Sequence, residues 1–125
     1  MRHWWVIVAA INGILAVGAG TISAHLLAAA PHRAHLLATG AQYAMYHALA
    51  LLALTALAGA KPVPAALAAA GWLFVAGTVL FSGSLYLLGL TEITAFAFVT
   101  PFGGIAFLLG WAALVAYGCR LRRGG

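Results

Sequence analysis

Four long apolar runs, separated by short polar breaks, make up most of the chain. The uncharged runs extend over residues 4–24, 36–60, 65–88 and 95–117, and each is 21 residues or longer. An α-helix needs about 20 apolar residues to cross the hydrocarbon core of a bilayer, so every run can span it. The breaks contain turn-forming residues such as Pro31, Pro62 and Pro64. The pattern predicts one all-α domain over residues 1–125, an integral membrane four-helix bundle whose short loops make neighbouring helices antiparallel.

The composition supports a membrane protein and changes how the net charge is interpreted. Hydrophobic residues make up 66% of the chain and charged residues 6%, whereas about a quarter of the residues of a soluble domain are charged. An ordinary soluble domain is therefore excluded, and membrane lipids are expected to surround most of the surface. A net charge of +5 would suggest a nucleic-acid partner in a soluble protein. Because the cations stand at the breaks between the apolar runs, we expect no nucleic-acid partner.

The cations are distributed unequally between the two predicted sides of the membrane. With four spans, the side that holds both termini carries five of them: Arg2, Lys61, Arg120, Arg122 and Arg123. The other side carries Arg33 alone. Loops rich in Lys and Arg stay in the cytoplasm, so both termini are predicted to be cytoplasmic. We expect a multi-pass protein of the bacterial inner membrane.

Small residues recur along the first and last predicted helices. Membrane helices associate through close packing of small side chains, because lipid is as apolar as Leu. The residues predicted to pack in this way are Ala9, Gly13, Ala16, Gly20, Gly103, Gly104 and Gly110. We also expect the protein to form a homo-oligomer.

Uncharged polar residues gather in the predicted outer half of the bundle. At a rise of 1.5 Å per residue, His47 lies roughly 15 Å inside a helix that begins at residue 36. The full set comprises His47, Tyr43, Tyr46, Gln42, His25, Ser82, Ser84, Tyr86 and Thr100. An ionisable group inside a bilayer is a functional candidate, although a neutral imidazole can also serve as a structural hydrogen-bonding group. His32 and His35, which flank Arg33, are expected in a solvated loop.

Two kinds of function remain open for this polar set. In one, the protein is a structural or accessory bundle, or binds lipid or a partner helix, and the polar residues hold the helices together. In the other, it is a small oligomeric transporter or channel that uses His47, with residues 101–104 breaking the last helix.

Metal binding and catalysis are less well supported by the residues present. His25 and His47 lie at different depths, and the single Cys119 is the only thiol, which leaves a poor ligand set for a metal or haem. Ser82 or Ser84 could form a Ser–His pair with His47, but the sequence has no Gly-x-Ser-x-Gly motif. We expect no cofactor, no metal, no catalytic residue and no enzymatic activity.

Four sequence segments, one from each predicted helix, resemble a known membrane family. They are Ser23-Ala24-His25, Gln42-Tyr43-Ala44-Met45-Tyr46-His47, Phe81-Ser82-Gly83-Ser84-Leu85-Tyr86 and Thr100-Pro101-Phe102-Gly103-Gly104, the last followed by Gly110-Trp111. Together they resemble the four-helix family called domain of unknown function 423, which includes relatives of eukaryotic transmembrane protein 256. In the first helix, Gly20-Thr21-Ile22-Ser23-Ala24-His25 stands where the family usually has Gly-Ala-Phe-Gly-Ala-His. The resemblance implies a small membrane bundle and no particular activity.

Overall fold

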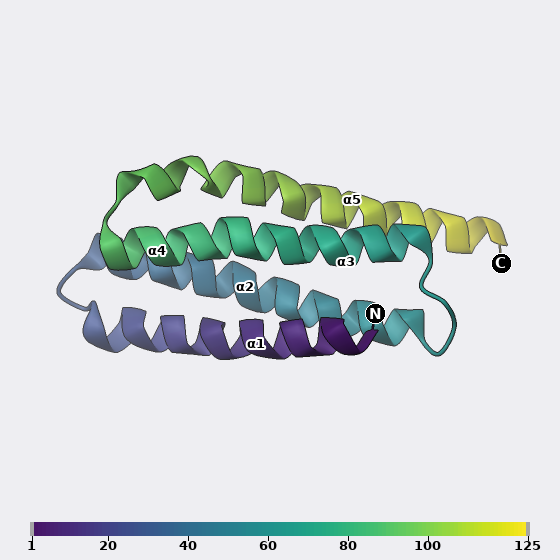
Figure 1. The fold of residues 1–125 in the computed structure, drawn as a ribbon, viewed down its shortest axis with the longest axis horizontal. Coiled ribbons are helices and arrows are strands. Elements are labelled where there is room, and N and C mark those ends of the chain that lie inside the picture. The colour runs from purple at the N-terminus through teal and green to yellow at the C-terminus, as the bar shows by residue number, and fades with distance from the viewer. Residues whose placement is uncertain (1, 125) are drawn as a thin grey trace.

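The computed structural model describes residues 2–124, and within that range every regular element is helical. In chain order the elements are α1 (Arg2–Thr21), the π-helical segment η1 (Ile22–Leu26), α2 (Pro31–Ala58), α3 (Ala65–Gly77), the π-helical segment η2 (Thr78–Ser82), α4 (Gly83–Thr91), the 3₁₀ segment η3 (Thr94–Phe98) and α5 (Thr100–Gly124). They form four stretches long and apolar enough to cross a membrane: His3–Leu26, Pro31–Ala58, Ala65–Thr91 and Thr94–Gly124. The predicted helical class and the four candidate spans are confirmed (Figure 1).

The second helix begins earlier than the apolar pattern predicts. It starts at Pro31, so the segment expected to be a loop around Arg33 is the first turn of α2. Proline suits the first helical position, because its fixed φ is helical and the missing N–H would have no partner there. His32 and His35 are exposed, but they lie on this helix and not in a loop. The predicted loop at these residues is therefore wrong.

Bulky side chains from one helix cover glycines of another at most helix interfaces. Trp5 of α1 lies over Gly71 of α3, and Tyr86 of α4 lies over Gly40 of α2. A Cβ added at Gly40 would come within 2.8 Å of the Tyr86 ring, closer than real Cβ atoms approach. Glycine thus brings these helices closer together than any other residue would allow.

The same contact is made in both directions between α3 and α5. Phe74 of α3 lies over Gly110 of α5, and Phe107 of α5 lies over Gly77 of α3. Both phenylalanines belong to the larger buried core, together with Trp5.

The small residues predicted to pack do not all face the bundle. Ala9 and Ala16 are buried in clusters that include alanines of α2, and Gly103 lies against the backbone of η2. By contrast, a Cβ added at Gly13 or Gly20 would meet no atom within 4 Å. Gly13 and Gly20 therefore share a stripe of α1 with Ala9 and Ala16 but leave space for a further side chain beside them.

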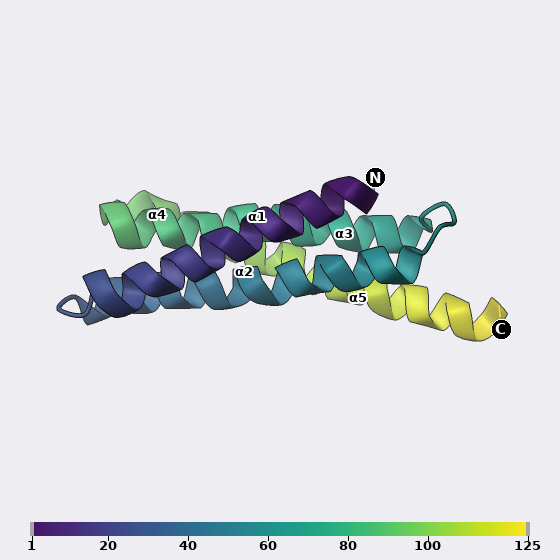
Figure 2. The same cartoon turned by 90° about the horizontal axis from the view of Figure 1, so that it is seen from below.

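The helix α1 changes neighbours along its length. Figure 2 shows it crossing the bundle obliquely, consistent with Trp5 near its start lying on α3. In η1, which continues α1, Ser23 donates a hydrogen bond to the Ala34 carbonyl oxygen of α2 at 2.7 Å. Many large apolar side chains outside the core are exposed, including Phe98 at 79% and Ile14 at 72%. Such a surface suits lipid as its surroundings.

Candidate functional site

His47 lies in the interior of the bundle with both ring nitrogens hydrogen-bonded. Its side chain is 3% exposed. Nδ1 lies 2.7 Å from the carbonyl oxygen of Tyr43, and Nε2 lies 3.1 Å from the indole Nε1 of Trp111. A carbonyl oxygen can only accept a hydrogen bond and an indole N–H can only donate one. The imidazole is therefore neutral, with its proton on Nδ1.

Aromatic rings surround this imidazole. The ring of Phe107 stacks on His47 with a centroid distance of 3.6 Å and an interplanar angle of 3°. Phe74 lies 5.1 Å away and Trp111 5.8 Å away, centroid to centroid. These rings come from α3 and α5, so His47 of α2 joins three of the four spans. The apolar surroundings suit a neutral imidazole, since burial away from water penalises a charged one.

The buried serines also connect helices. Ser82, at the end of η2, is fully buried and donates a hydrogen bond to the Gly40 carbonyl oxygen of α2 at 2.8 Å. Ser84 of α4 donates to the Phe81 carbonyl oxygen at 2.9 Å, and its hydroxyl oxygen lies 2.6 Å from the Thr100 hydroxyl oxygen of α5. Each hydroxyl therefore has a protein partner, and two of these bonds cross between spans.

The π-helical segment η2 brings these groups into position. A π turn inserts an extra residue into a helix and rotates the residues that follow. Within it, Phe81 lies against the Gly103 backbone of α5 while Ser82 reaches α2. Adjacent residues of this segment therefore contact two different neighbouring helices.

The other predicted polar residues lie away from His47 or use different partners. The side chains of Tyr43 and Tyr46 are 39% and 50% exposed, and Gln42 donates a hydrogen bond to the Tyr46 hydroxyl on the same face of α2. Tyr43 contributes only its carbonyl oxygen and its ring to the surroundings of His47. His25 is exposed on η1. The hydroxyl of Tyr86 is buried above Gly40, with no hydrogen-bond partner among residues 2–124.

Two polar contacts involve residues that the sequence interpretation did not single out for them. Trp111 is the hydrogen-bond donor to His47. In the sequence, the only signal for this contact was a tryptophan one turn after Phe107 on an apolar helix. Arg33 does not lie free in solvent: its Nε and Nη2 donate to the carbonyl oxygens of Gly89 and Leu90 at 2.7 and 3.0 Å. A cation near unpaired carbonyls at a helix C-terminus is favourable, so Arg33 caps α4.

The described part of the chain contains no ready-made metal site. Over residues 2–124, no three His, Cys, Asp or Glu side chains gather closely enough to hold a metal ion. Both nitrogens of His47 are already hydrogen-bonded, so a metal could bind there only by displacing Tyr43 or Trp111.

Comparison with known proteins identifies the family. The family model described as "Protein of unknown function (DUF423)" matches residues 19–104. The chain belongs to the DUF423 family. Among relatives, it is 44% identical over 113 residues to the "UPF0382 membrane protein YwdK" of Bacillus subtilis, covering 89% of this chain and 92% of the relative. It is 39% identical over 125 residues to the "UPF0382 inner membrane protein YgdD" of Escherichia coli, covering 98% of this chain and 95% of the relative.

The names of these DUF423 relatives and the four apolar spans together confirm the predicted multi-pass location in a bacterial membrane. The predicted family resemblance is likewise confirmed, and neither relative's name states an activity. No solved structure matches the chain.

Proposed function

We propose that this DUF423 protein is a structural or accessory membrane bundle, whose buried polar residues hold its helices together. In this proposal it acts on lipids or partner helices through its outer surface, not through chemistry at His47. Neighbouring helices are antiparallel and both termini are cytoplasmic. The position of the 59–64 connection at the same end of the bundle as the C-terminal part of α5 supports this orientation (Figure 1), since both segments carry cations.

The hydrogen bonding of His47 carries the proposal. A histidine that shuttles protons or binds a metal needs a nitrogen that can exchange partners. Here one nitrogen donates to its own helix and the other accepts from Trp111 of α5. In a membrane, where water does not compete in the hydrocarbon core, such a bond joins two helices and also selects their register.

Replacing His47 tests the structural role directly. The variant His47→Ala should unfold at a lower temperature in mild detergent and should be extracted from membranes in a less stable form. His35→Ala is the matched control, since it removes an exposed imidazole from the same helix and should change neither property. Unchanged thermal stability of His47→Ala would contradict the proposal.

Transport by this protein is tested with the same two variants. Vesicles containing the purified protein should show no more flux of protons, divalent metal ions or small solutes than empty vesicles. Flux present with the natural sequence and absent with His47→Ala would overturn the structural proposal and support a transporter or channel.

The homo-oligomer expected from the sequence is also part of the proposal. Support comes from α1, where a Cβ added at Gly13 or Gly20 would meet no atom within 4 Å and Val17 between them is exposed. Small and β-branched residues along one face allow two membrane helices to pack closely.

A further inference from the structure

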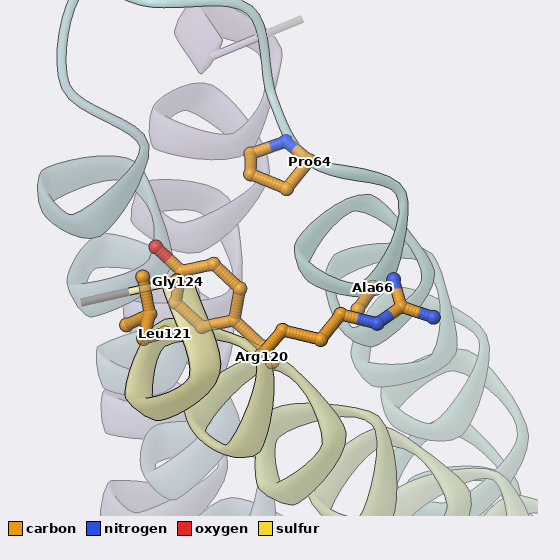
Figure 3. A pocket seen from close by; sticks show the side chains of 6 residues that line it. Pro64, Ala66, Arg120, Leu121 and Gly124 are labelled. Carbon is orange, nitrogen blue, oxygen red and sulfur yellow. The ribbon is translucent and has the colours of Figure 1, made fainter.

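The basic end of the bundle contains a cavity unrelated to the surroundings of His47. It has a volume of about 400 Å³ and lies between the connection that leads into α3 and the last turns of α5. The residues that line it are Pro64, Ala66, Tyr117, Arg120, Leu121 and Gly124. Figure 3 shows the Arg120 side chain extending from α5 toward Ala66 in the first turn of α3.

The cavity combines a cation with apolar walls. The guanidinium of Arg120 offers planar paired N–H donors that match a phosphate group, and the hydroxyl of Tyr117 can add a further donor. Leu121, Pro64 and Ala66 provide apolar surface beside these polar groups. A ligand that fits both parts carries an anionic phosphate joined to an apolar portion.

The charge around this cavity favours an anionic ligand. Lys61 precedes it in the chain, and Arg122 and Arg123 follow Arg120. The only acidic side chain of the sequence, Glu92, follows α4 at the opposite end of the bundle (Figure 1). No acidic side chain is therefore available at this end to neutralise the cations, and phosphates of anionic lipids attract such clusters.

We propose that this cavity binds the headgroup of an anionic phospholipid, with Arg120 contacting the phosphate and the apolar walls contacting the glycerol and the first acyl carbons. Tyr117 ends the last apolar run, the position at which aromatic residues of membrane proteins commonly meet the headgroup layer. The site goes beyond the proposed structural function, because it assigns a specific ligand to one part of the outer surface.

Native mass spectrometry of the purified full-length protein in mild detergent tests this site. The protein is titrated in parallel with dioleoyl phosphatidylglycerol, dioleoyl phosphatidylcholine and inorganic phosphate. We expect one phosphatidylglycerol retained per chain with saturable affinity, and weaker retention of phosphatidylcholine. Equal affinity for the two lipids would overturn the proposal. It would also be overturned if inorganic phosphate bound as tightly as phosphatidylglycerol, since the site would then bind the free anion.

Two pairs of variants distinguish the cavity from general attraction to a basic surface. Arg120→Gln should weaken phosphatidylglycerol binding about 30-fold, the effect of losing a hydrogen bond to a charged group. Arg123→Gln removes the same charge from a residue that does not line the cavity, and should weaken binding about fivefold or less. Equal losses in the two variants would overturn the proposal.

The second pair changes the volume of the cavity without changing charge. Ala66→Leu fills space at the wall of the cavity and should reduce binding as strongly as Arg120→Gln. Ala69→Leu adds the same side chain at an exposed position one turn further along α3, and should bind as the natural sequence does. Retained binding in Ala66→Leu, with its fold verified by an unchanged unfolding temperature, would refute the location.

Discussion

Removing the indole N–H of Trp111 isolates the hydrogen bond that joins α5 to His47. Trp111→Phe keeps an aromatic ring next to Phe74, whose centroid lies 4.9 Å from that of Trp111. It leaves Nε2 of His47 without its donor, in a side chain that is only 3% exposed. Hydrogen bonds between membrane helices contribute about 0.6 kcal/mol on average and about 1.7 kcal/mol at most. A buried acceptor left unpaired costs about 1–3 kcal/mol. We therefore expect a loss of about 1–2 kcal/mol in the free energy of unfolding.

A double-mutant cycle separates the hydrogen bond from the packing of the two rings. The variants Trp111→Phe, His47→Leu and their combination are unfolded reversibly in mixed micelles of a mild detergent and dodecyl sulfate. In the His47→Leu background, Trp111→Phe should be less destabilising by about 1 kcal/mol than in the natural sequence. The reason is that the indole N–H of Trp111 has already lost its acceptor in that background. Trp72→Phe is the control, since Trp72 is 54% exposed on α3.

Two results would refute this reasoning. A coupling energy within error of zero would mean that the bond between His47 and Trp111 contributes nothing to stability. Nitrogen-15 NMR of labelled histidine gives an independent measurement, in which His47 should appear as the neutral tautomer protonated on Nδ1. The opposite tautomer, or a charged ring at neutral pH, would be incompatible with the two hydrogen bonds described.

Three further predictions concern other helix contacts. Gly103→Ala should destabilise the bundle by about 1–3 kcal/mol in the same unfolding assay, because the added Cβ would lie 2.7 Å from a backbone atom of η2. Gly104→Ala should be nearly neutral, since its nearest contact is at 3.9 Å, and equal effects would contradict the packing described. Arg33→Gln should speed amide hydrogen exchange in the last turn of α4 about tenfold, as the cap on two carbonyls is lost; unchanged exchange would contradict the capping role. Gly13→Leu should abolish chemical cross-linking between copies without lowering the unfolding temperature, whereas Gly18→Leu, at an equally open position, should preserve cross-linking.

The apolar runs predicted the four candidate spans because crossing a bilayer depends on length and hydrophobicity, which are local properties of a sequence. Their ends were less predictable. A proline breaks the apolar pattern in the same way whether it follows the end of one helix or begins the next. Only the folded chain shows that Pro31 is the first residue of α2.

The role of each small residue depended on the neighbouring helices. In α1, Ala9 and Gly13 are both small and four residues apart, yet Ala9 is buried while Gly13 is open. From the sequence, both were predicted to pack against a neighbouring helix. The oblique crossing of α1 over α2 and α3 decides which of the two residues a neighbouring helix covers.

Sequence alone determined that this protein is an all-helical membrane protein, its family, and that His47 is an ionisable residue inside a span. The tertiary structure decided what His47 contacts. Its hydrogen-bond donor Trp111 is 64 positions away along the chain and is brought to it by the packing of the helices. It also decided that Arg33 reaches the carbonyl of Gly89, 56 positions along the chain. Hydrophobicity is the sum of individual side chains and can be read locally, whereas a contact between helices depends on the register and rotation of both.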